Sequence, residues 1–367
     1  HSAKIKSIAY FDMPGGNTRI ITGSEDKTVA IWDFNSGTVF KHFTRNDAIH
    51  CLAVCQKTGI LVVGTADRKI AVYDIKSERV ADIVNVADFE TIHTDLILSL
   101  AILASDDKKE SIQIVSVGWD KRMVVWDCFG KNIDQFEKGH TKSITALVAH
   151  TPSGEESSGV DLAPILITGS LDKTVIVWDF GTLKKIRVLE GHKGQVTAVK
   201  VSDRDDDGSP PIVITASLDK MLILWDLLSG YRVRTIEYSE PLNTLAIIDS
   251  IDGIIAISSG NSPFLLTWDL RRTHRTRKFV TGAVTAIDVY TPPNNGTPQV
   301  IIGAVDRKFT VFDYNDSKNY LTQHDYHTKR INAGVIYTPL TNVPNPGLPP
   351  TPLVVSADGN ADIKVWT

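Results

Sequence analysis

Cysteine is scarce in this chain of 367 residues, which contains only Cys51, Cys55 and Cys128. Because a low cysteine content is typical of proteins in a reducing compartment, we expect this protein in the cytosol or the nucleus. No apolar run reaches the roughly 18 to 20 residues of a membrane span, and no signal pattern opens the chain. The glycosylation sequons at Asn295 and Asn315 are therefore interpreted as chance matches.

Positive charge is not in excess either, because 39 Lys and Arg face 43 Asp and Glu, for a net charge of -4. A nucleic-acid or membrane binder usually shows a concentrated basic field, so neither partner is expected. One basic stretch begins with Arg271 and ends with Lys278, where we expect a turn between two strands. An acidic stretch at residues 203–207 should lie on the same face. We interpret the basic stretch as a solvated hairpin rather than a nucleic-acid or acidic-lipid contact.

The residues for metal or phosphate chemistry are also missing. Cys51 and Cys55 are four positions apart in an expected strand, which places their α-carbons roughly 13 Å apart, too far to share a zinc ion. Cys128 stands alone in a turn. No Gly-rich phosphate loop and no His pair with helical spacing occurs. We therefore expect no metal, no cofactor, no small-molecule substrate and no enzymatic activity.

What the chain does contain is a repeat. Eight times a short apolar run ends in an aromatic residue, usually followed by Asp, and in six copies a tight turn like Ser-x-Asp-Lys-Thr precedes that run. The spacing between closing aromatics runs from 41 to 54 residues, and roughly 40 to 45 residues is the length of a four-stranded propeller blade. The closing aromatics are Trp32, Tyr73, Trp126, Trp178, Trp225, Trp268, Phe312 and Trp366.

With these motifs the chain resembles the WD-repeat β-propellers over its whole length. A sheet whose strands are apolar on both faces cannot bury those faces by itself. Stacking such sheets as neighbouring blades of a propeller buries both faces. We predict one all-β domain, an eight-bladed WD-repeat propeller whose last blade lacks its outer strand. In the fourth copy, strands are expected at residues 143–149, 165–169, 174–179 and 183–189. The expected blades are residues 1–44, 45–92, 93–139, 140–191, 192–237, 238–279, 280–326 and 327–367.

In four copies a His, a Ser or Thr, an Asp and a Trp recur at matching positions. Ser, His and Asp are the parts of a hydrolase triad, but one set per repeat, ending on an indole, does not suit a single active site. The resemblance implies a structural hydrogen-bond network instead. The sets are His1, Thr22, Asp26, Trp32; His93, Ser116, Asp120, Trp126; His140, Thr168, Asp172, Trp178; and His192, Thr215, Asp219, Trp225.

Other copies lack parts of this network. Arg45 and Val63 replace the His and the hydroxyl in the second copy, and Tyr238 and Val280 stand at the His position in the sixth and seventh. The eighth copy has Asn360 in place of the Asp. Two interpretations stay open: these blades are less rigid at their inner loops, or other packing has replaced the network.

The resemblance also implies a partner-binding face with three positions per blade, namely the third and fifth residues after the His and the residue before the turn Asp. The expected apolar group on this face is Leu96, Leu98, Trp119, Leu171 and Leu218. The expected cationic group is Lys4, Lys6, Arg45 and Arg330.

We therefore predict a scaffold or adaptor that binds a protein or peptide partner around the central channel. Two alternatives stay open: a reader of phosphorylated or acidic peptides through the cationic group, and a sensor or targeting domain of a larger protein. Trp119 is the only one of the seven Trp residues that does not close a copy. It is either an interface anchor or a plug of the channel.

Overall fold

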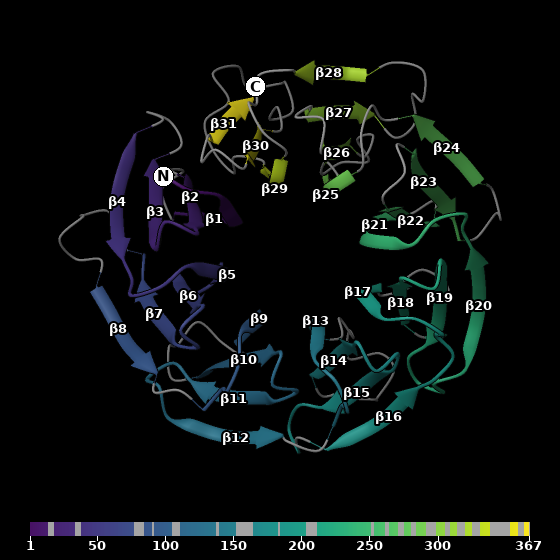
Figure 1. The fold of residues 1–367 in the computed structure, drawn as a ribbon, viewed down its shortest axis with the longest axis horizontal. Helices are drawn as coiled ribbons and strands as arrows, with labels where there is room; N and C mark the ends of the chain where they lie inside the picture. The colour runs from purple at the N-terminus through teal and green to yellow at the C-terminus, as the bar shows by residue number, and fades with distance from the viewer. Residues whose placement is uncertain are drawn as a thin grey trace, which may run out of the picture. The chain divides into compact units, whose positions relative to one another are not determined.

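The computed structural model describes the chain in segments that cover most of its strands. These are residues 1–13, 18–33, 38–76, 84–89, 92–104, 111–136, 139–151, 164–182, 184–202, 211–250, 253–260, 264–270, 275–279, 284–290, 299–304, 309–313, 320–324, 331–337, 353–358 and 363–366. In them, the strands form eight antiparallel sheets, seven of four strands and one of three (Figure 1). No helix among these residues is long and apolar enough to cross a membrane.

Each sheet takes its strands in chain order. The first four sheets comprise β1 (Ile5–Asp12), β2 (Thr18–Ser24), β3 (Thr28–Asp33), β4 (Val39–Thr44); β5 (Ile49–Cys55), β6 (Ile60–Thr65), β7 (Ile70–Asp74), β8 (Val84–Phe89); β9 (Ile97–Ala104), β10 (Ile112–Gly118), β11 (Met123–Asp127), β12 (Asn132–Phe136); and β13 (Ile144–His150), β14 (Ile165–Ser170), β15 (Val175–Asp179), β16 (Lys185–Leu189).

The remaining four sheets comprise β17 (Val196–Ser202), β18 (Ile212–Ser217), β19 (Met221–Asp226), β20 (Arg232–Glu237); β21 (Leu242–Ser250), β22 (Gly253–Gly260), β23 (Phe264–Asp269), β24 (Arg275–Phe279); β25 (Val284–Tyr290), β26 (Gln299–Ala304), β27 (Phe309–Asp313), β28 (Tyr320–His324); and β29 (Ile331–Tyr337), β30 (Leu353–Asp358), β31 (Ile363–Trp366). The last sheet has three strands in the described residues. Each sheet lies inside one of the eight expected blade ranges, while the blade count and the single domain stay predictions.

The chain divides into two compact units. The first contains residues 1–116, 124–134 and 285–367, and the second contains residues 117–123 and 135–284. In the first unit β29 lies beside β1, β1 beside β5, and β5 beside β9; in the second, β13 lies beside β17 and β17 beside β21. Within each unit, successive sheets therefore pack mainly through their first strands, and β29 also lies beside β26.

The core of each unit lies between facing sheets. Ile167 and Val177 of one sheet belong to a single buried cluster with Val199 and Val213 of the next sheet. Every residue of β6, β14 and β18 is buried. Strands covered on both faces read as continuous apolar runs rather than alternating ones, which explains the short runs of the repeat.

The tight turns of the first five copies have one shared geometry. In the first, the N–H of Lys27 donates to the carbonyl oxygen of Ser24 (3.3 Å), and the Asp26 carboxylate accepts from the Thr28 N–H (2.9 Å). The residue after the Asp lies in the left-handed region, which non-glycine residues rarely adopt. The Asp side chain stabilises this turn locally. The φ angles are 71° at Lys27, 70° at Arg68, 68° at Lys121, 77° at Lys173 and 71° at Lys220.

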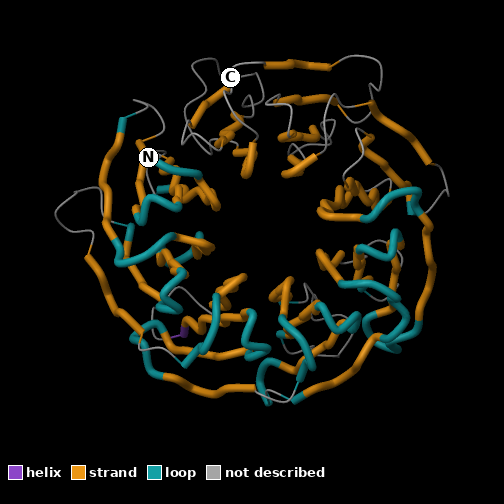
Figure 2. The backbone as a smooth tube through the Cα atoms, viewed as in Figure 1, coloured by secondary structure: helices purple, strands orange, loops and turns teal. Residues whose placement is uncertain are grey.

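Part of the basic stretch forms a strand rather than a turn. Residues Arg275–Phe279 are β24, which pairs with β23 through partners such as Arg275 and Trp268. Residues 271–274, the acidic stretch at 203–207 and both sequons lie outside the described residues. Figure 2 shows β24 in orange as the outer strand of its sheet.

Candidate functional site

The repeated polar network is formed as the sequence predicts in the fourth copy. The Nδ1 atom of His140 lies 3.0 Å from Oδ2 of Asp172, and its Nε2 atom lies 2.8 Å from Oγ1 of Thr168. The Trp178 indole N–H donates to the same Thr168 oxygen (2.9 Å). These four side chains join the loop before β13, strand β14, the tight turn and strand β15.

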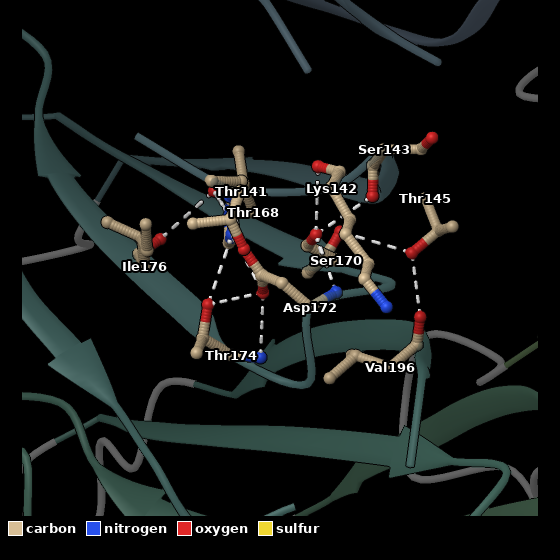
Figure 3. Close-up of polar contacts among 12 residues, drawn as sticks. Thr141, Lys142, Ser143, Thr145, Thr168, Ser170, Asp172, Thr174, Ile176 and Val196 are labelled. Carbon is tan, nitrogen blue, oxygen red and sulfur yellow. Dashed lines mark hydrogen bonds and ion pairs between the residues drawn. The ribbon is translucent and has the colours of Figure 1, made fainter. Parts of the chain in front are cut away.

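The Asp172 carboxylate is held by several donors (Figure 3). It accepts from the Thr174 hydroxyl (2.6 Å), the Thr174 N–H (3.0 Å) and the Thr141 N–H (2.8 Å). Burial alone would raise the pKa of Asp172, but these hydrogen bonds and the adjacent His140 outweigh it and lower the pKa to about 2. Burial lowers the pKa of His140 despite the nearby Asp172 charge. Asp172 is therefore ionised and His140 neutral at neutral pH.

The same arrangement occurs in other copies. The His-to-hydroxyl distances are 2.7 Å for His1 and Thr22, 2.8 Å for His93 and Ser116, and 2.8 Å for His192 and Thr215. The indole N–H donates to the hydroxyl at 2.8 Å from Trp32, 2.9 Å from Trp126 and 2.9 Å from Trp225. All four hydroxyl residues are fully buried. A buried hydroxyl already bonded to a His and a Trp is suited to joining strands rather than to attacking a substrate.

The network makes stability sensitive to acid. Burial lowers the pKa of His140 and of His192 below the ordinary 6.5, so the unfolded chain binds protons on these side chains that the folded protein does not. The free energy of unfolding should therefore fall as the pH drops below about 6.5. It should fall further below the ordinary Asp value of 3.8 as Asp172 approaches its own pKa of about 2. Urea unfolding between about pH 7 and pH 4 measures the decrease that the histidines cause, and a constant free energy of unfolding over this range would contradict it.

The second copy replaces the network with another one. Arg45 donates to the Tyr73 hydroxyl (3.1 Å) and to Oδ1 of Asp88 on β8 (2.5 Å). The Tyr73 ring stacks on Phe43 with 4.3 Å between centroids. In this copy, other contacts have therefore replaced the His, hydroxyl and Trp network, which is the second of the two interpretations left open above. The sequence signal for it is the simultaneous change of the His, the hydroxyl residue and the Trp, to Arg45, Val63 and Tyr73.

The sixth copy differs again. Tyr238, at the His position, lies edge-on to Trp268 with ring centroids 6.0 Å apart. Ser258, at the hydroxyl position, is fully buried, and its hydroxyl has no hydrogen-bond partner in the part of the chain that the structure describes. An aromatic contact therefore takes the place of the His at this position. Val280 and Asn360, of the seventh and eighth copies, lie outside the described residues.

The positions of the expected binding face are adjacent within each copy. The N–H of the residue before the turn Asp donates to the carbonyl oxygen of the third residue after the His position. The four cases are Glu25 to Lys4 (2.9 Å), Ala66 to Ala48 (2.8 Å), Leu171 to Ser143 (3.0 Å) and Leu218 to Gln195 (3.0 Å).

The expected apolar residues are distributed over both units. Trp119, Leu171 and Leu218 belong to the second unit, and Leu96 and Leu98 to the first. The Trp119 side chain is 49% exposed and that of Leu218 is 38% exposed, while the other three are half-buried. The Trp119 carbonyl oxygen accepts from the Ser143 hydroxyl (3.0 Å), which connects this turn to the segment before β13.

Two of the expected cationic residues lie beside carboxylates. Nζ of Lys6 is 3.5 Å from Oε1 of Glu25, and Arg45 is paired with Asp88. Lys4 is half-buried before β1, and Arg330 lies outside the described residues. These carboxylates offset much of the positive charge that would attract a phosphate. The phosphopeptide reader stays a prediction.

Two threonines of the expected face have a role that the sequence does not reveal. The Thr145 hydroxyl lies 2.6 Å from the carbonyl oxygen of Val196 (Figure 3), and the Thr197 hydroxyl lies 2.9 Å from that of Leu242. Each contact joins the first strand of one sheet to the start of the next. Threonine at the fifth position after the His is the signal that could have identified these links.

Among the described residues, no group of three or more His, Cys, Asp or Glu is placed to hold a metal ion. Cys51, Cys55 and Cys128 are buried and form no disulfide. Burial raises the pKa of the Cys51 thiol to about 12, so it stays protonated at neutral pH.

Four-stranded antiparallel sheets in chain order, packed through their first strands, define a β-propeller. The repeat described as "WD domain, G-beta repeat" matches residues 1–33, 130–179 and 183–226, and these matches support the WD-repeat family that the sequence resembles. Sqt1 of Saccharomyces cerevisiae has the same fold, with a TM-score of 0.81 at 12% identity over 100% of this chain and 96% of that one.

Similarity to curated proteins is confined to parts of their sequences. Autophagy-related protein 16 of Arabidopsis thaliana is 25% identical over 184 residues, which are 50% of this chain and 32% of that protein. The mRNA export factor GLE2 of Chaetomium thermophilum is 40% identical over 76 residues, 21% of this chain and 20% of that protein. The chain therefore matches about a third or less of these relatives' length.

Proposed function

We propose that this protein is a non-catalytic platform for protein interaction, and that Trp119 is the anchor of its main docking site. Leu171 and Leu218 of the same unit extend the site, while Leu96 and Leu98 of the first unit stay predicted partner contacts in their own right. The observation that carries the proposal is the 49% exposure of Trp119. Exposed tryptophans that are rigidly held are typical of interface hot spots.

The indole is presented on a fixed turn. The N–H of Lys121 donates to the carbonyl oxygen of Gly118 (3.3 Å), and the Ser143 hydroxyl holds the Trp119 carbonyl. A side chain on such a turn loses little backbone entropy when a partner binds, so more of its burial contributes to affinity. This exposure favours the interface anchor over the channel plug.

The absence of catalysis is part of the proposal. Its support is that Thr168 and its three equivalents are buried within their networks, away from any substrate. The names of the relatives, an autophagy-related protein and an mRNA export factor, fit a cytoplasmic or nuclear adaptor. Partner recognition by a surface, with no chemistry, is the proposed activity.

Replacing Trp119 by alanine should weaken partner binding by about 30-fold, because loss of an anchor commonly costs about 2 kcal/mol. The partner is first captured from the source cell with the unaltered chain and identified, and its affinity for each variant is then measured by calorimetry. Phe129, which is 55% exposed in the turn after β11, provides the matched control, because Phe129→Ala removes an exposed aromatic outside the proposed site.

Thermal unfolding of Trp119→Ala separates the two roles of the residue. Lost affinity with an unchanged melting temperature supports the docking site. Unchanged affinity, or a loss of affinity that follows a large loss of stability, would show that the partner docks elsewhere or that Trp119 is structural.

A further inference from the structure

The outer strands of two neighbouring sheets in the second unit share a pattern. Strand β16 reads Lys-Ile-Arg-Val from residue 185, and strand β20 reads Arg-Val-Arg-Thr from residue 232. Because successive side chains of a strand point to opposite faces, each strand carries cations on one face and β-branched residues on the other. This surface is separate from the turn that holds Trp119.

Several apolar side chains of these strands and of the turn between β19 and β20 are exposed. Tyr231 is 78% exposed and Val233 is 56% exposed, and Ile186, Val188 and Leu228 are between 41% and 47% exposed. These five residues are half of the ten large apolar residues that are exposed in the described chain. Large exposed apolar patches are rare on monomeric proteins and commonly mark sites of interaction.

Strand β16 contacts the turn between β19 and β20, so these residues belong to one surface. The Arg187 guanidinium donates to the carbonyl oxygen of Leu228, and the space beside Gly230 is filled by Arg187, whose Cδ would lie 2.8 Å from an added Cβ. Gly230 has φ 76°, which reverses the chain at that point. We call β16, β20 and this turn the outer-edge surface.

The outer-edge surface carries positive charge without ion pairs among the described residues. Its four cations there form no ion pair with a described carboxylate; they are Lys185, Arg187, Arg232 and Arg234. The turn carboxylates of Asp179 and Asp226 accept from Thr182 and Ser229 instead. Glu190 and Glu237 stand at the far ends of the two strands. A partner with acidic side chains is therefore favoured.

Both strands are also open for pairing. Each is outermost in its sheet, and among the described strands β16 pairs only with β15 and β20 only with β19. Cations on edge strands commonly protect a sheet from unwanted pairing. Protection alone would need only the exposed cations such as Arg232, whereas here the apolar Tyr231 and Val233 are exposed beside them.

We propose that the outer-edge surface binds an extended protein segment in which acidic and apolar side chains alternate, added to the sheet as a strand beside β20. Main-chain hydrogen bonds to the open edge supply affinity, and the side chains supply specificity. The acidic positions of the segment face Arg232 and Arg234, and its apolar positions pack on Tyr231 and Val233.

A displayed library tests this surface directly. The library consists of peptides of about ten residues with Asp or Glu at alternate positions and varied apolar residues between them; a matched library carries Lys in place of the acids. We expect binders from the acidic library only, with affinities that fall as salt is added. Arg232→Glu and Tyr231→Ser should each weaken a selected peptide by about 30-fold.

Lys193→Glu provides the matched control, because this exposed lysine lies in the loop before β17, outside the outer-edge surface. It should leave the affinity unchanged, as should Trp119→Ala, and thermal unfolding verifies the fold of every variant. Methylating alternate backbone nitrogens of the peptide should abolish binding if it is an added strand.

Three results would overturn the proposal. They are equal binding of both libraries, binding that Arg232→Glu leaves unchanged, and binding that backbone methylation leaves unchanged. If the peptides do not bind but vesicles rich in phosphatidylserine do, and Arg232→Glu abolishes the vesicle binding, the surface contacts lipid instead.

Discussion

Replacing Thr168 by valine should lower the free energy of unfolding by about 3 kcal/mol, although the two side chains have nearly the same shape. The hydroxyl accepts from the Trp178 indole (2.9 Å) and lies 2.8 Å from Nε2 of His140. Valine would leave both buried partners without a hydrogen bond, and each unsatisfied buried group costs about 1 to 3 kcal/mol. Urea unfolding with a common m-value measures the difference.

Two further variants identify the cause. Thr168→Ser keeps the hydroxyl and should cost less than about 1.5 kcal/mol, since Ser116 forms the same two contacts in the third copy. Thr235→Val makes the same chemical change at an exposed threonine of β20 and should stay within about 0.5 kcal/mol. If Thr168→Ser were as unstable as Thr168→Val, packing of the methyl group would be the cause and the network would not.

The fourth copy shows how well local pattern predicts these strands. The second strand, expected at residues 165–169, is Ile165–Ser170, and the outer strand, expected at 183–189, is Lys185–Leu189. The apolar run and the Ser-x-Asp-Lys turn determine both ends of the buried strand. The outer strand is less well defined because it has little burial to set where it begins.

The network of the second copy could not be predicted in the same way. The prediction includes Arg45 in a cationic binding group because it stands at the His position of the second copy, on the expected binding face. Its partner Asp88 lies 43 positions away in an outer strand of weak pattern. The Thr145 contact with Val196 spans 51 positions and joins two sheets. Such contacts depend on how sheets pack, which a repeat with variable loops does not specify.

Which face of an outer strand is exposed also follows from packing. The alternation of Arg232, Val233 and Arg234 shows that cations and apolar residues lie on opposite faces, but a sequence alone would place the apolar face inside. In the structure Arg234 instead reaches the carbonyl oxygen of Leu270 in the next sheet (3.4 Å), and Val233 is exposed. The neighbouring sheet decides the orientation.

Replacing Gly139 by alanine should destabilise the protein by about 2 kcal/mol, although alanine normally stabilises a glycine site of ordinary backbone conformation. A Cβ at Gly139 would lie 2.4 Å from Cη2 and 2.8 Å from Cζ2 of Trp178. The indole cannot move away freely, because its N–H is bonded to Thr168. Either the ring or the loop that carries His140 must shift, and the network weakens in both cases.

Gly191 offers the matched control, since it precedes His192 as Gly139 precedes His140. There the added Cβ would lie 3.1 Å from Cη2 of Trp225, so a shift of a few tenths of an ångström accommodates it. Gly191→Ala should therefore cost less than about 1 kcal/mol. Combining Gly139→Ala with Thr168→Val should cost less than the sum of the two single changes, because each disturbs the same indole. Equal losses for the two glycines, or full additivity in the double variant, would show that the indole's hydrogen bond does not fix the ring, and the effect of Gly139 would then be one of backbone flexibility alone.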